Sequence, residues 1–460
     1  MSAYAAENLP KRWFIGEEHT KMKLTIPSKA EKILRILEEN GYEAYVVGGC
    51  VRDSIMGRIP DDWDITTSAQ PEQVKALFHR TVDTGLQHGT VTVLIEKEGF
   101  EVTTYRVDGD YEDGRHPKEV LFTSSLEEDL KRRDFTINAM AYHPDKGLVD
   151  LFHGMEDMRN KVIRCVGSPR ERFREDALRI LRAVRFSAQL GFSIEQKTKE
   201  GIQALASNLK CVSAERIQTE LVKLLVSPHP DYFRTAYETG VTRQFLPEFD
   251  VCMETEQNTP HHCWTVGEHI LHSLLYIRPD KVLRLAMLLH DIGKPAVKKT
   301  DENGRDHFKT HGSQSEKMAK EILRRLKFDN DTTAKVCRLI RWHDARPLPE
   351  MRQVRKAVNR IGEDLFPLYL EVQRADMMAQ SEYKRVEKEA RLKGVTFCYQ
   401  RILEEKQCVS LKTLAVKGRD LIEAGYRPGP EIGEKLNFLL EHVLEVPEDN
   451  QKEILLSLLK

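Results

Sequence analysis

Two aspartates separated by a single residue are the feature of this sequence most suggestive of chemistry. Asp62 and Asp64 lie in the segment "DDWDITT", directly before an apolar residue. Residues two apart along an extended strand point to the same side, so these carboxylates would repel each other unless a cation lay between them. Paired carboxylates commonly hold Mg²⁺, whose remaining positions go to water and substrate phosphate. The pair therefore predicts a Mg²⁺ site that acts on a phosphate compound.

An exposed acidic turn is the competing interpretation, because so short a motif often occurs by chance. The surrounding residues favour the metal site. Gly48–Gly49 follow a predicted strand and precede a predicted helix, where backbone N–H groups can meet phosphate. Arg52, on the first turn of that helix, can bind a phosphate oxygen. Glu101 is the candidate third carboxylate, although an ordinary exposed strand glutamate explains it nearly as well.

The elements that must position these residues are predicted to be mixed α/β up to about Cys165. From Ser168 onward apolar residues recur at helical spacing, so the remainder is predicted to be all-α. In the first part we expect a helix over Ser28–Gly41 with a capping box of Ser28 and Glu31, a buried strand over Glu43–Val47, and a hairpin of Thr90–Ile95 with Phe100–Val107.

Bulk composition indicates a multidomain cytoplasmic protein. The chain has 460 residues and a net charge of −1, so any nucleic-acid surface must be local. Its eight cysteines are scattered without a CxxC pair, which is typical of reduced thiols. No apolar run reaches the ~18 residues of a membrane span. We expect no membrane association and find no indication of an obligate protein partner.

Five segments carry a resemblance to a known family, and they occur in the family's order. They are "GGCVRD…DDWDIT", "RVDGDYEDGRHPKEVLF", "LKRRDFTINAMA", "ERFREDALRILRAVRF" and "SAERIQTEL". Over Gly48–Leu221 the chain resembles bacterial class II CCA-adding tRNA nucleotidyltransferases and their poly(A) polymerase relatives. The resemblance implies an α/β polymerase-beta-like nucleotidyltransferase head followed by an all-α neck, HD and tail region. The expected segments are an N-terminal extension (1–22), head (23–165), helical neck and tRNA-binding region (166–255), HD domain (256–380) and helical tail (381–460).

The same resemblance implies roles for individual residues. Asp62 and Asp64 would hold Mg²⁺, Gly49 and Arg52 would contact the triphosphate, Arg132 would contact the nucleotide, and Asp134 would reach the ribose. The implied reaction adds CCA to tRNA 3′ ends from CTP and ATP without a nucleic-acid template.

The segment Arg159–Phe186 suggests how a protein could choose bases. It holds nine basic residues against three acids, an excess that suits triphosphate and tRNA backbone. Asp176 and Arg179 are three residues apart, which predicts neighbours on one face of a single helix. Asp176 only accepts hydrogen bonds and Arg179 only donates them. Cytosine and adenine both present an amino donor beside a ring-nitrogen acceptor, which this pair fits, whereas uracil and guanine do not. The family assigns this role to the same two positions, with Arg182 and Arg185 in support; a solvated charged helix is the alternative.

A second constellation lies in the C-terminal half. His269, His290, Asp291 and Asp376 are candidate metal ligands, with His311 and His343 as further candidates. The first three are predicted to lie on helices. Imidazole with carboxylate suits Mn, Ni or Mg. "LLHDIGKP" resembles the core of the HD phosphohydrolase superfamily, which implies phosphatase or phosphodiesterase activity, here on RNA ends. For any single histidine a structural role is the better explanation.

Several functions stay open on this evidence. An enzyme that adds only A, or poly(A), would share the base-reading pair, while the segment Arg106–Phe122 argues mildly against one confined to CC addition. A different class is an HD phosphohydrolase whose N-terminal half is a regulatory nucleotide-binding module. A pure RNA-binding scaffold is the weakest alternative.

Overall fold

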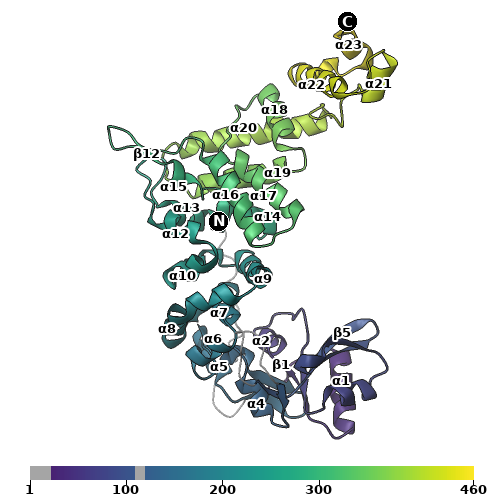
Figure 1. The fold of residues 1–460 in the computed structure, drawn as a ribbon, viewed down its shortest axis with the longest axis vertical. Helices are drawn as coiled ribbons and strands as arrows, with labels where there is room; N and C mark the ends of the chain where they lie inside the picture. Colours follow the sequence, from purple (N-terminus) through teal and green to yellow (C-terminus); the bar gives the residue numbers. More distant parts are fainter. Residues whose placement is uncertain (1–21, 109–119, 460) are drawn as a thin grey trace. The chain divides into compact units, whose positions relative to one another are not determined.

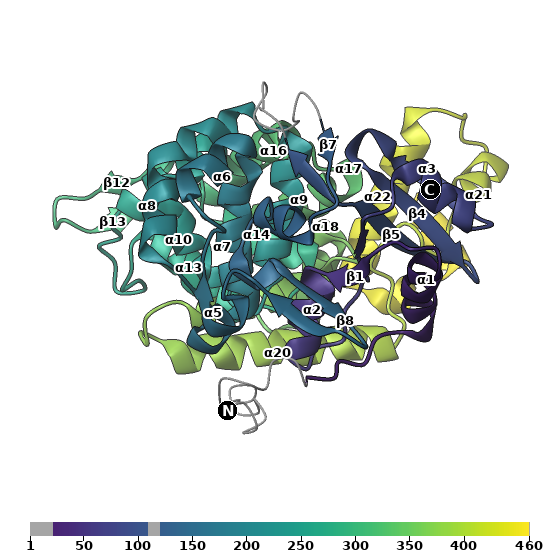
Figure 2. The same cartoon turned by 90° about the horizontal axis from the view of Figure 1, so that it is seen from below.

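The computed structural model describes residues 22–108 and 120–459 (Figures 1 and 2). The chain forms two compact units. The first comprises Met1–Glu220 and Thr235–Phe245, and the second comprises Leu221–Arg234 and Leu246–Lys460. The predicted extension, apart from its last residue, lies outside the described residues. The finer division into five segments stays a prediction.

A seven-stranded mixed sheet forms the centre of the first unit. The strand order is β3-β4-β5-β2-β1-β8-β9, in which only the β2–β5 pairing is parallel. This sheet with the helical region that follows confirms the predicted fold class. The strands are β1 (Ala44–Val47), β2 (Ile65–Thr67), β3 (Thr81–Gly85), β4 (Thr90–Ile95), β5 (Glu98–Thr104), β8 (Met140–His143) and β9 (Gly147–Asp150).

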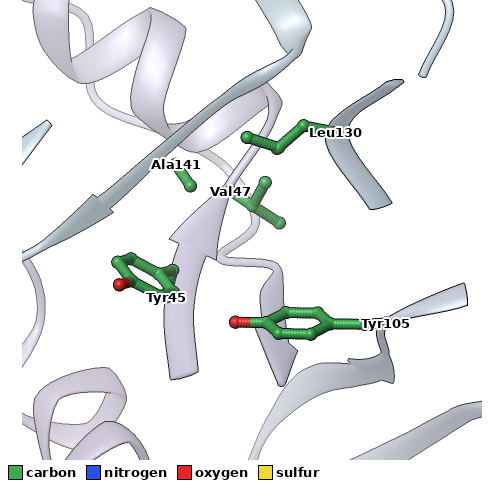
Figure 3. Close-up of a cluster of buried hydrophobic side chains, with 5 residues drawn as sticks. All are labelled: Tyr45, Val47, Tyr105, Leu130 and Ala141. Carbon is green, nitrogen blue, oxygen red and sulfur yellow. The ribbon is translucent and has the colours of Figure 1, made fainter. Parts of the chain in front are cut away.

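Strand β1 is an interior strand of the sheet, between β2 and β8, and all four of its residues are buried. Tyr45 and Val47 extend from one face of the strand and form a hydrophobic cluster with Tyr105, Leu130 and Ala141 (Figure 3). Alternate residues of a strand point to opposite faces, so a fully buried strand must be covered on both. This cluster supports the turn that follows β1, where Gly48 and Gly49 lie.

Helix α1 (Ser28–Glu39) buries Ala30, Ile33, Leu34 and Leu37, which share one helical face. The predicted capping box is wrong. Pro27 is the N-cap, and the Glu31 N–H donates to the Pro27 carbonyl at 3.0 Å, so the helix begins one residue earlier than a Ser28 cap requires. The Glu31 carboxylate instead accepts from Arg35 at 3.3 Å.

The predicted hairpin is present but shorter than expected. Its turn is Glu96–Lys97, both with positive φ, which suits the twist of a two-residue hairpin. The second strand does not continue to residue 107: β5 ends at Thr104, and β6 (Arg106–Asp108) pairs separately with β7 (Val120–Phe122). Most of the loop predicted to matter for CCA addition, residues 109–119, lies outside the described residues.

The rest of the first unit is mainly helical. The periodic segment from Ser168 forms two helices, α6 and α7, which are separated at Asp176–Ala177. A two-residue parallel pair, β10 (Val162–Ile163) with β11 (Ser193–Ile194), interrupts the predicted all-α region. The helices are α2 (Gly49–Ile55), α3 (Pro71–Leu77), α4 (Leu126–Lys131), α5 (Gly154–Asn160), α6 (Pro169–Glu175), α7 (Leu178–Leu190), α8 (Gln196–Leu205) and α11 (Thr242–Phe245), while α9 (Ala214–Leu225) and α10 (Phe233–Glu238) have residues in both units.

The second unit is helical apart from a short β12–β13 pair (Lys299–Thr300, Asp306–His307). The polar stretch that follows α12 and ends at Thr265 leads to α13, and α20 is one continuous helix in both views (Figures 1 and 2). No described helix is long and apolar enough to cross a membrane. The helices are α12 (Pro247–Glu254), α13 (Val266–Leu275), α14 (Lys281–Leu289), α15 (Lys294–Val297), α16 (His311–Arg325), α17 (Asn330–Trp342), α18 (Met351–Ile361), α19 (Phe366–Met378), α20 (Arg385–Glu404), α21 (Gly418–Glu423), α22 (Pro430–Glu445) and α23 (Lys452–Ser457).

Candidate active site and metal centre

The paired aspartates lie immediately before β2 rather than within it. The backbone of Asp64 is already part of the sheet, because its carbonyl accepts from the Val47 N–H at 3.0 Å. Asp62 is exposed, whereas Asp64 is half-buried. One carboxylate is therefore fixed by the central strands and the other faces solvent.

Glu101 lies beside Asp64, as the sheet register requires. In the parallel pairing of β2 with β5, Ile65 is opposite Val102, so the residues that precede them are also neighbours. Burial raises the pKa of Asp64, and the charges of Glu101 and Asp62 raise it further, whereas Arg133 lowers it. The carboxylates are more loosely arranged than a closed metal site, since within the described head no three such donor atoms lie within 4.8 Å of one another.

Arg52 is buried and tightly held. Its Nε and Nη2 donate to the carboxylate of Asp53 at 3.0 and 2.8 Å, and its Nη1 donates to Asn138 Oδ1 at 2.5 Å. The predicted phosphate contact therefore depends on a guanidinium whose orientation the protein already fixes. Gly48, which precedes α2, has φ of +84°, and a Cβ there would lie 3.0 Å from Arg133 Nη1. Glycine is needed here for both conformation and space.

Arg133 is a functional candidate that we did not predict. It follows the predicted Arg132, and of this pair it is Arg133 that interacts with Asp64. Arg132 instead donates to the buried Asp129 through Nε and Nη2, at 3.0 and 2.7 Å. Burial raises the pKa of Asp129, but the two arginines lower it overall. The sequence does show two adjacent arginines in "LKRRDF". Because adjacent side chains point in different directions, either of the two could have been the one near Asp64.

Asp134 has its carboxylate occupied within the protein. Arg182 donates to Oδ2 through Nε and Nη2 at 2.8 and 2.6 Å, while Oδ1 accepts from Asn138 Nδ2 and the Phe135 N–H. Burial alone would raise the pKa of Asp134, but Arg182 and these donors lower it well below the ordinary value. In this structure Asp134 orients Arg182, and the predicted ribose contact stays a prediction.

Phe186 is a second residue that the sequence analysis did not single out. Three guanidinium groups surround its ring, with Arg52, Arg182 and Arg185 at 5.0, 5.3 and 3.7 Å from the centroid. Arg185 also pairs with Glu220 at 2.5 Å, and burial lowers its pKa to about 10. The ring therefore joins the predicted phosphate-binding arginine of α2 to the predicted supporting arginines of α7.

Asp176 and Arg179 do not share one helix, which corrects that part of the prediction. Asp176 has extended backbone between α6 and α7, and its Oδ1 accepts from the Leu178 N–H at 3.0 Å, which caps α7. Its Oδ2 accepts from Arg216 at 2.8 Å, and Arg179 donates to Glu175 at 2.5 Å. Both groups are thus held by other partners in this structure.

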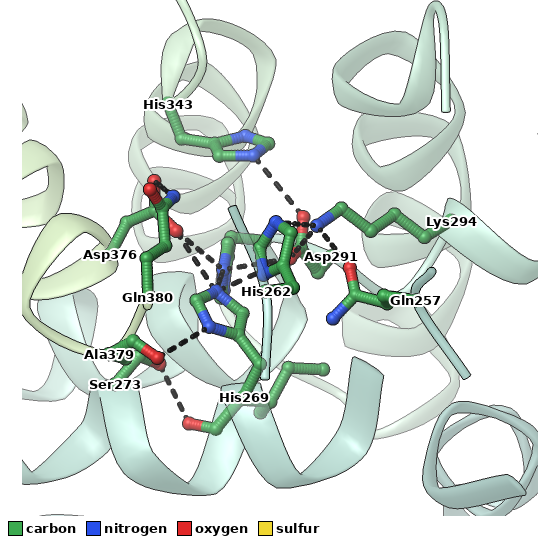
Figure 4. Close-up of polar contacts among 12 residues, drawn as sticks. Gln257, His262, His269, Ser273, Asp291, Lys294, His343, Asp376, Ala379 and Gln380 are labelled. Carbon is green, nitrogen blue, oxygen red and sulfur yellow. Dashed lines mark hydrogen bonds and ion pairs between the residues drawn. The ribbon is translucent and has the colours of Figure 1, made fainter. Parts of the chain in front are cut away.

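In the second unit, all six predicted histidines and aspartates come together. His269, Asp291, His343 and Asp376 are labelled in Figure 4. His269 lies on α13, His311 begins α16 and Asp376 lies on α19. The other three lie just past helix ends rather than within helices, contrary to our expectation for the doublet: His290 and Asp291 follow α14, and His343 follows α17. All six are buried.

Asp291 divides this cluster into two overlapping groups of donors. Its Oδ2 lies 3.5 and 3.3 Å from the Nε2 atoms of His269 and His290, and its Oδ1 lies 3.5 and 3.4 Å from those of His311 and His343. Asp376 Oδ1 lies 2.9 Å from His269 Nε2. In each of the two triads that share Asp291, the donor atoms lie within 4.8 Å of one another.

The hydrogen bonds of the histidines leave their Nε2 atoms for a metal. The Nδ1 atom of each histidine faces a backbone carbonyl. The pairs are His269 with Ala379 at 3.4 Å, His290 with Met287 at 2.7 Å, His311 with Phe308 at 2.8 Å and His343 with Ile340 at 2.7 Å. A carbonyl can only accept, so each Nδ1 donates to it and each Nε2 is directed into the cluster. The Nε2 atoms face each other in two pairs, at 3.2 Å for His269–His290 and 3.0 Å for His311–His343. A divalent ion in the cluster would take both nitrogens of a pair as ligands.

Asp291 supports the same interpretation. Both of its buried oxygens lack a well-oriented hydrogen-bond donor, although Lys294 Nζ lies 2.7 Å from Oδ2. Burial raises the pKa of Asp291, yet His290 and Lys294 lower it far below the ordinary value, so the residue is a carboxylate. The donor set, of imidazole nitrogens around a shared carboxylate, fits divalent transition metals. Lys294 and its partner Gln257, at 2.9 Å, were not predicted.

Comparison with known proteins covers almost the whole chain. Three families match in succession: "Poly A polymerase head domain" over residues 44–164, "Probable RNA and SrmB- binding site of polymerase A" over 191–253, and "tRNA nucleotidyltransferase domain 2" over 306–459. The HD resemblance stays a prediction.

Individual relatives agree with these families. The chain is 36% identical to the CCA-adding enzyme of Lactobacillus helveticus over 92% of this chain and 94% of the relative, and 35% identical to that of Levilactobacillus brevis over 93% and 96%. The solved structure of the Bacillus stearothermophilus CCA-adding enzyme in complex with CTP is 30% identical, with a TM-score of 0.70 over 94% of this chain and 96% of that one. These matches confirm the predicted family: the chain belongs to the CCA-adding enzymes and is a nucleotidyltransferase.

Proposed function

We propose that the first unit adds C, C and A to tRNA 3′ ends from CTP and ATP in a Mg²⁺-dependent reaction. The observation that carries this proposal is the register of β2 with β5, which brings Glu101 to Asp64 while Asp62 remains open to solvent. Membership of the family supports it, as does the complex of the Bacillus stearothermophilus relative with CTP.

The carboxylates of Asp62, Asp64 and Glu101 fit a hard cation such as Mg²⁺. The charges of Asp62 and Glu101 raise the pKa of Asp64, and a bound cation would relieve this repulsion. Asp62 and Asp64 would hold Mg²⁺, with Glu101 as the third carboxylate. When bound, the ion activates the primer 3′-hydroxyl and neutralises the leaving pyrophosphate. Arg52 and Arg133 would supply positive charge for the triphosphate. Gly48, which Arg133 approaches closely, has no side chain that could obstruct the turn before α2.

The decisive experiment separates the sister activities of this family. Purified protein is incubated with tRNA that lacks its 3′ end, tRNA ending in C, and tRNA ending in CC, with CTP or ATP supplied separately. Full CCA addition predicts CTP incorporation on the first two substrates and a single ATP incorporation on the third. Incorporation of ATP alone would identify an A-adding enzyme, and runs of A would identify a poly(A) polymerase.

We further propose that the buried cluster of the second unit is a metal-dependent phosphohydrolase site for RNA ends. The observation that favours it is the set of four Nδ1–carbonyl bonds, which directs four Nε2 atoms to the two oxygens of Asp291. His269, His290 and Asp376 would hold one divalent ion, and His311 and His343 a second, with Asp291 shared. A bound divalent ion supplies Lewis acidity and a water of lowered pKa.

The test compares two histidines on the same helix. His269 belongs to the cluster, whereas His272 on α13 stacks on Trp264 at 4.4 Å. His269→Ala is expected to lower the metal content of protein purified from medium supplemented with Mn²⁺ or Ni²⁺, and to abolish hydrolysis of 3′-phosphorylated or 2′,3′-cyclic RNA ends. His272→Ala should retain both. Wild-type protein that holds metal but hydrolyses neither substrate would leave the cluster a structural metal site.

A further inference from the structure

A cavity of about 170 Å³ opens beside Asp376 in the second unit. Of the residues that line it, only Asp376 was predicted from the sequence as a site residue. The lining comes from the loop after α17, from α19 and from the first half of α20, with His261 from the polar break before α13. Asp376 belongs to both the cavity and the metal cluster, so anything bound in the cavity would lie next to the proposed hydrolytic site.

The cavity carries an excess of positive charge. Four basic residues line it, Arg346, Lys384, Lys388 and Arg391, against the acids Asp376 and Glu387. Asp376 offsets part of this charge, since its Oδ2 lies 3.9 Å from Arg346 Nη2 and also accepts from Gln380 at 2.9 Å. Arg346 pairs in addition with Asp344 at 2.9 Å, whereas Lys384, Lys388 and Arg391 keep the lining positive overall. A cavity with this charge favours an anion, and phosphate oxygens are the usual partners of clustered Arg and Lys.

Two polar groups of the cavity, those of Lys388 and His261, can contact a ligand. Lys388 Nζ donates to Gln380 Oε1 at 2.8 Å, and Gln380 lies beside Asp376 (Figure 4), so a short chain of contacts connects the cation to the metal cluster. Among the described residues His261 Nδ1 is buried without a hydrogen-bond partner. Burial, together with the nearby Arg346, lowers the pKa of Lys388, which shows how closely the positive charges are gathered.

The remaining wall is apolar. Tyr369, Met377, Leu392 and Val395 line it, and Tyr369 is fully buried. A bare inorganic anion gains nothing from such a wall, whereas the ribose or base of a nucleotide can pack on it.

We propose that this cavity binds the terminal phosphorylated nucleotide of an RNA, with Arg346 and Lys388 holding its phosphate and the Tyr369–Val395 wall receiving the nucleoside. The inference rests on the proposed phosphohydrolase function, for which it names the substrate-binding residues.

The test is binding of adenosine 3′-monophosphate to the metal-free full chain, by calorimetry, with saturating CTP present to occupy the nucleotide site of the first unit. Each charge-assisted hydrogen bond contributes about 1.5–3 kcal/mol. Arg346→Gln and Lys388→Gln should therefore each raise the Kd by about tenfold or more. The matched control is Lys393→Gln, an exposed residue of α20 outside the cavity, which should change the Kd less than about twofold. Adenosine without phosphate should bind at least tenfold more weakly to the wild type.

Equal binding by the wild type and both cavity variants, with unchanged thermal unfolding, would overturn the inference. The proposed hydrolase is scored separately, with Mn²⁺-loaded protein and 3′-phosphorylated RNA. If the Arg346 and Lys388 variants hydrolysed RNA ends with an unchanged KM, the substrate-binding role of the cavity would be refuted and the hydrolase proposal would not. If those variants lost binding but the wild type showed no hydrolysis, the hydrolase proposal would be refuted and the binding role of the cavity would not.

Discussion

At the scale of single residues, Asp62 and its neighbour Asp61 offer a clean comparison. Both are exposed, but only Asp62 has the i, i+2 relation to Asp64. Removal of a single preorganised group that stabilises the transition-state charge costs about 10²–10³-fold in rate, and a ligand of the catalytic metal acts on the same charge. For Asp62→Ala we expect the rate of CTP incorporation to fall by this factor, and for Asp61→Ala by less than about threefold. Both rates are measured in single turnover on tRNA without its 3′ end. Equal losses would place the cation elsewhere.

Base selection is also decided by individual groups. In the predicted base-reading role, the incoming base would compete with Arg216 for Asp176 and with Glu175 for Arg179, because these pairs are formed in this structure. Sites that pair buried polar groups with substrate reject wrong partners strongly. Asp176→Ala and Arg179→Ala should therefore raise UTP or GTP incorporation relative to CTP by at least about tenfold. Unchanged nucleotide ratios in single-turnover assays of both variants would refute the base-reading role.

At the scale of elements, α7 is joined to α2 through the ring of Phe186. Each of its three guanidinium contacts is worth about 0.5–2 kcal/mol, and a smaller side chain would loosen the predicted nucleotide-binding arginines together. We expect Phe186→Leu to raise the KM for CTP several-fold. Phe173→Leu, in the buried aromatic residue of α6, should lower the unfolding midpoint comparably without that KM change. Parallel denaturant titrations and kinetics on both variants test this, and an equal KM change in both would contradict it.

The elements also show what the sequence could and could not predict. Strands β1 and β4 were predicted because their apolar residues are continuous or alternate between turn signals. The HD doublet was predicted because "LLHDIGKP" resembles the core of the HD phosphohydrolase superfamily. The break at Asp176 was missed, since Leu178, Leu181 and Val184 keep a helical period on one side of it. Arg133, Lys294 and Gln257 were missed because their roles depend on partners distant in sequence, such as Asp64.

At the scale of the whole molecule, the two candidate sites lie in different compact units, with Asp62 in the first and Asp291 in the second. Their chemistry should therefore separate. Asp291→Ala removes the carboxylate shared by both donor groups and leaves Lys294 without its buried ion pair at 2.7 Å. We expect this variant to lose bound metal and RNA-end hydrolysis, while CTP and ATP incorporation by the intact chain stays within about twofold, because the two sites are built from residues of separate compact units and share no partner among the described residues.

Metal binding provides a measurement of this separation that does not depend on activity. An ion that binds only the folded second unit stabilises it by about 2.7 kcal/mol at one hundred times its Kd. Added Mn²⁺ should therefore raise the unfolding midpoint of wild-type protein and of Asp62→Ala equally, and leave Asp291→Ala unchanged. If Asp62→Ala instead abolished RNA-end hydrolysis with its metal content intact, the first unit would regulate the second. The protein would then be an HD phosphohydrolase controlled by nucleotide, which is the alternative that the sequence left open.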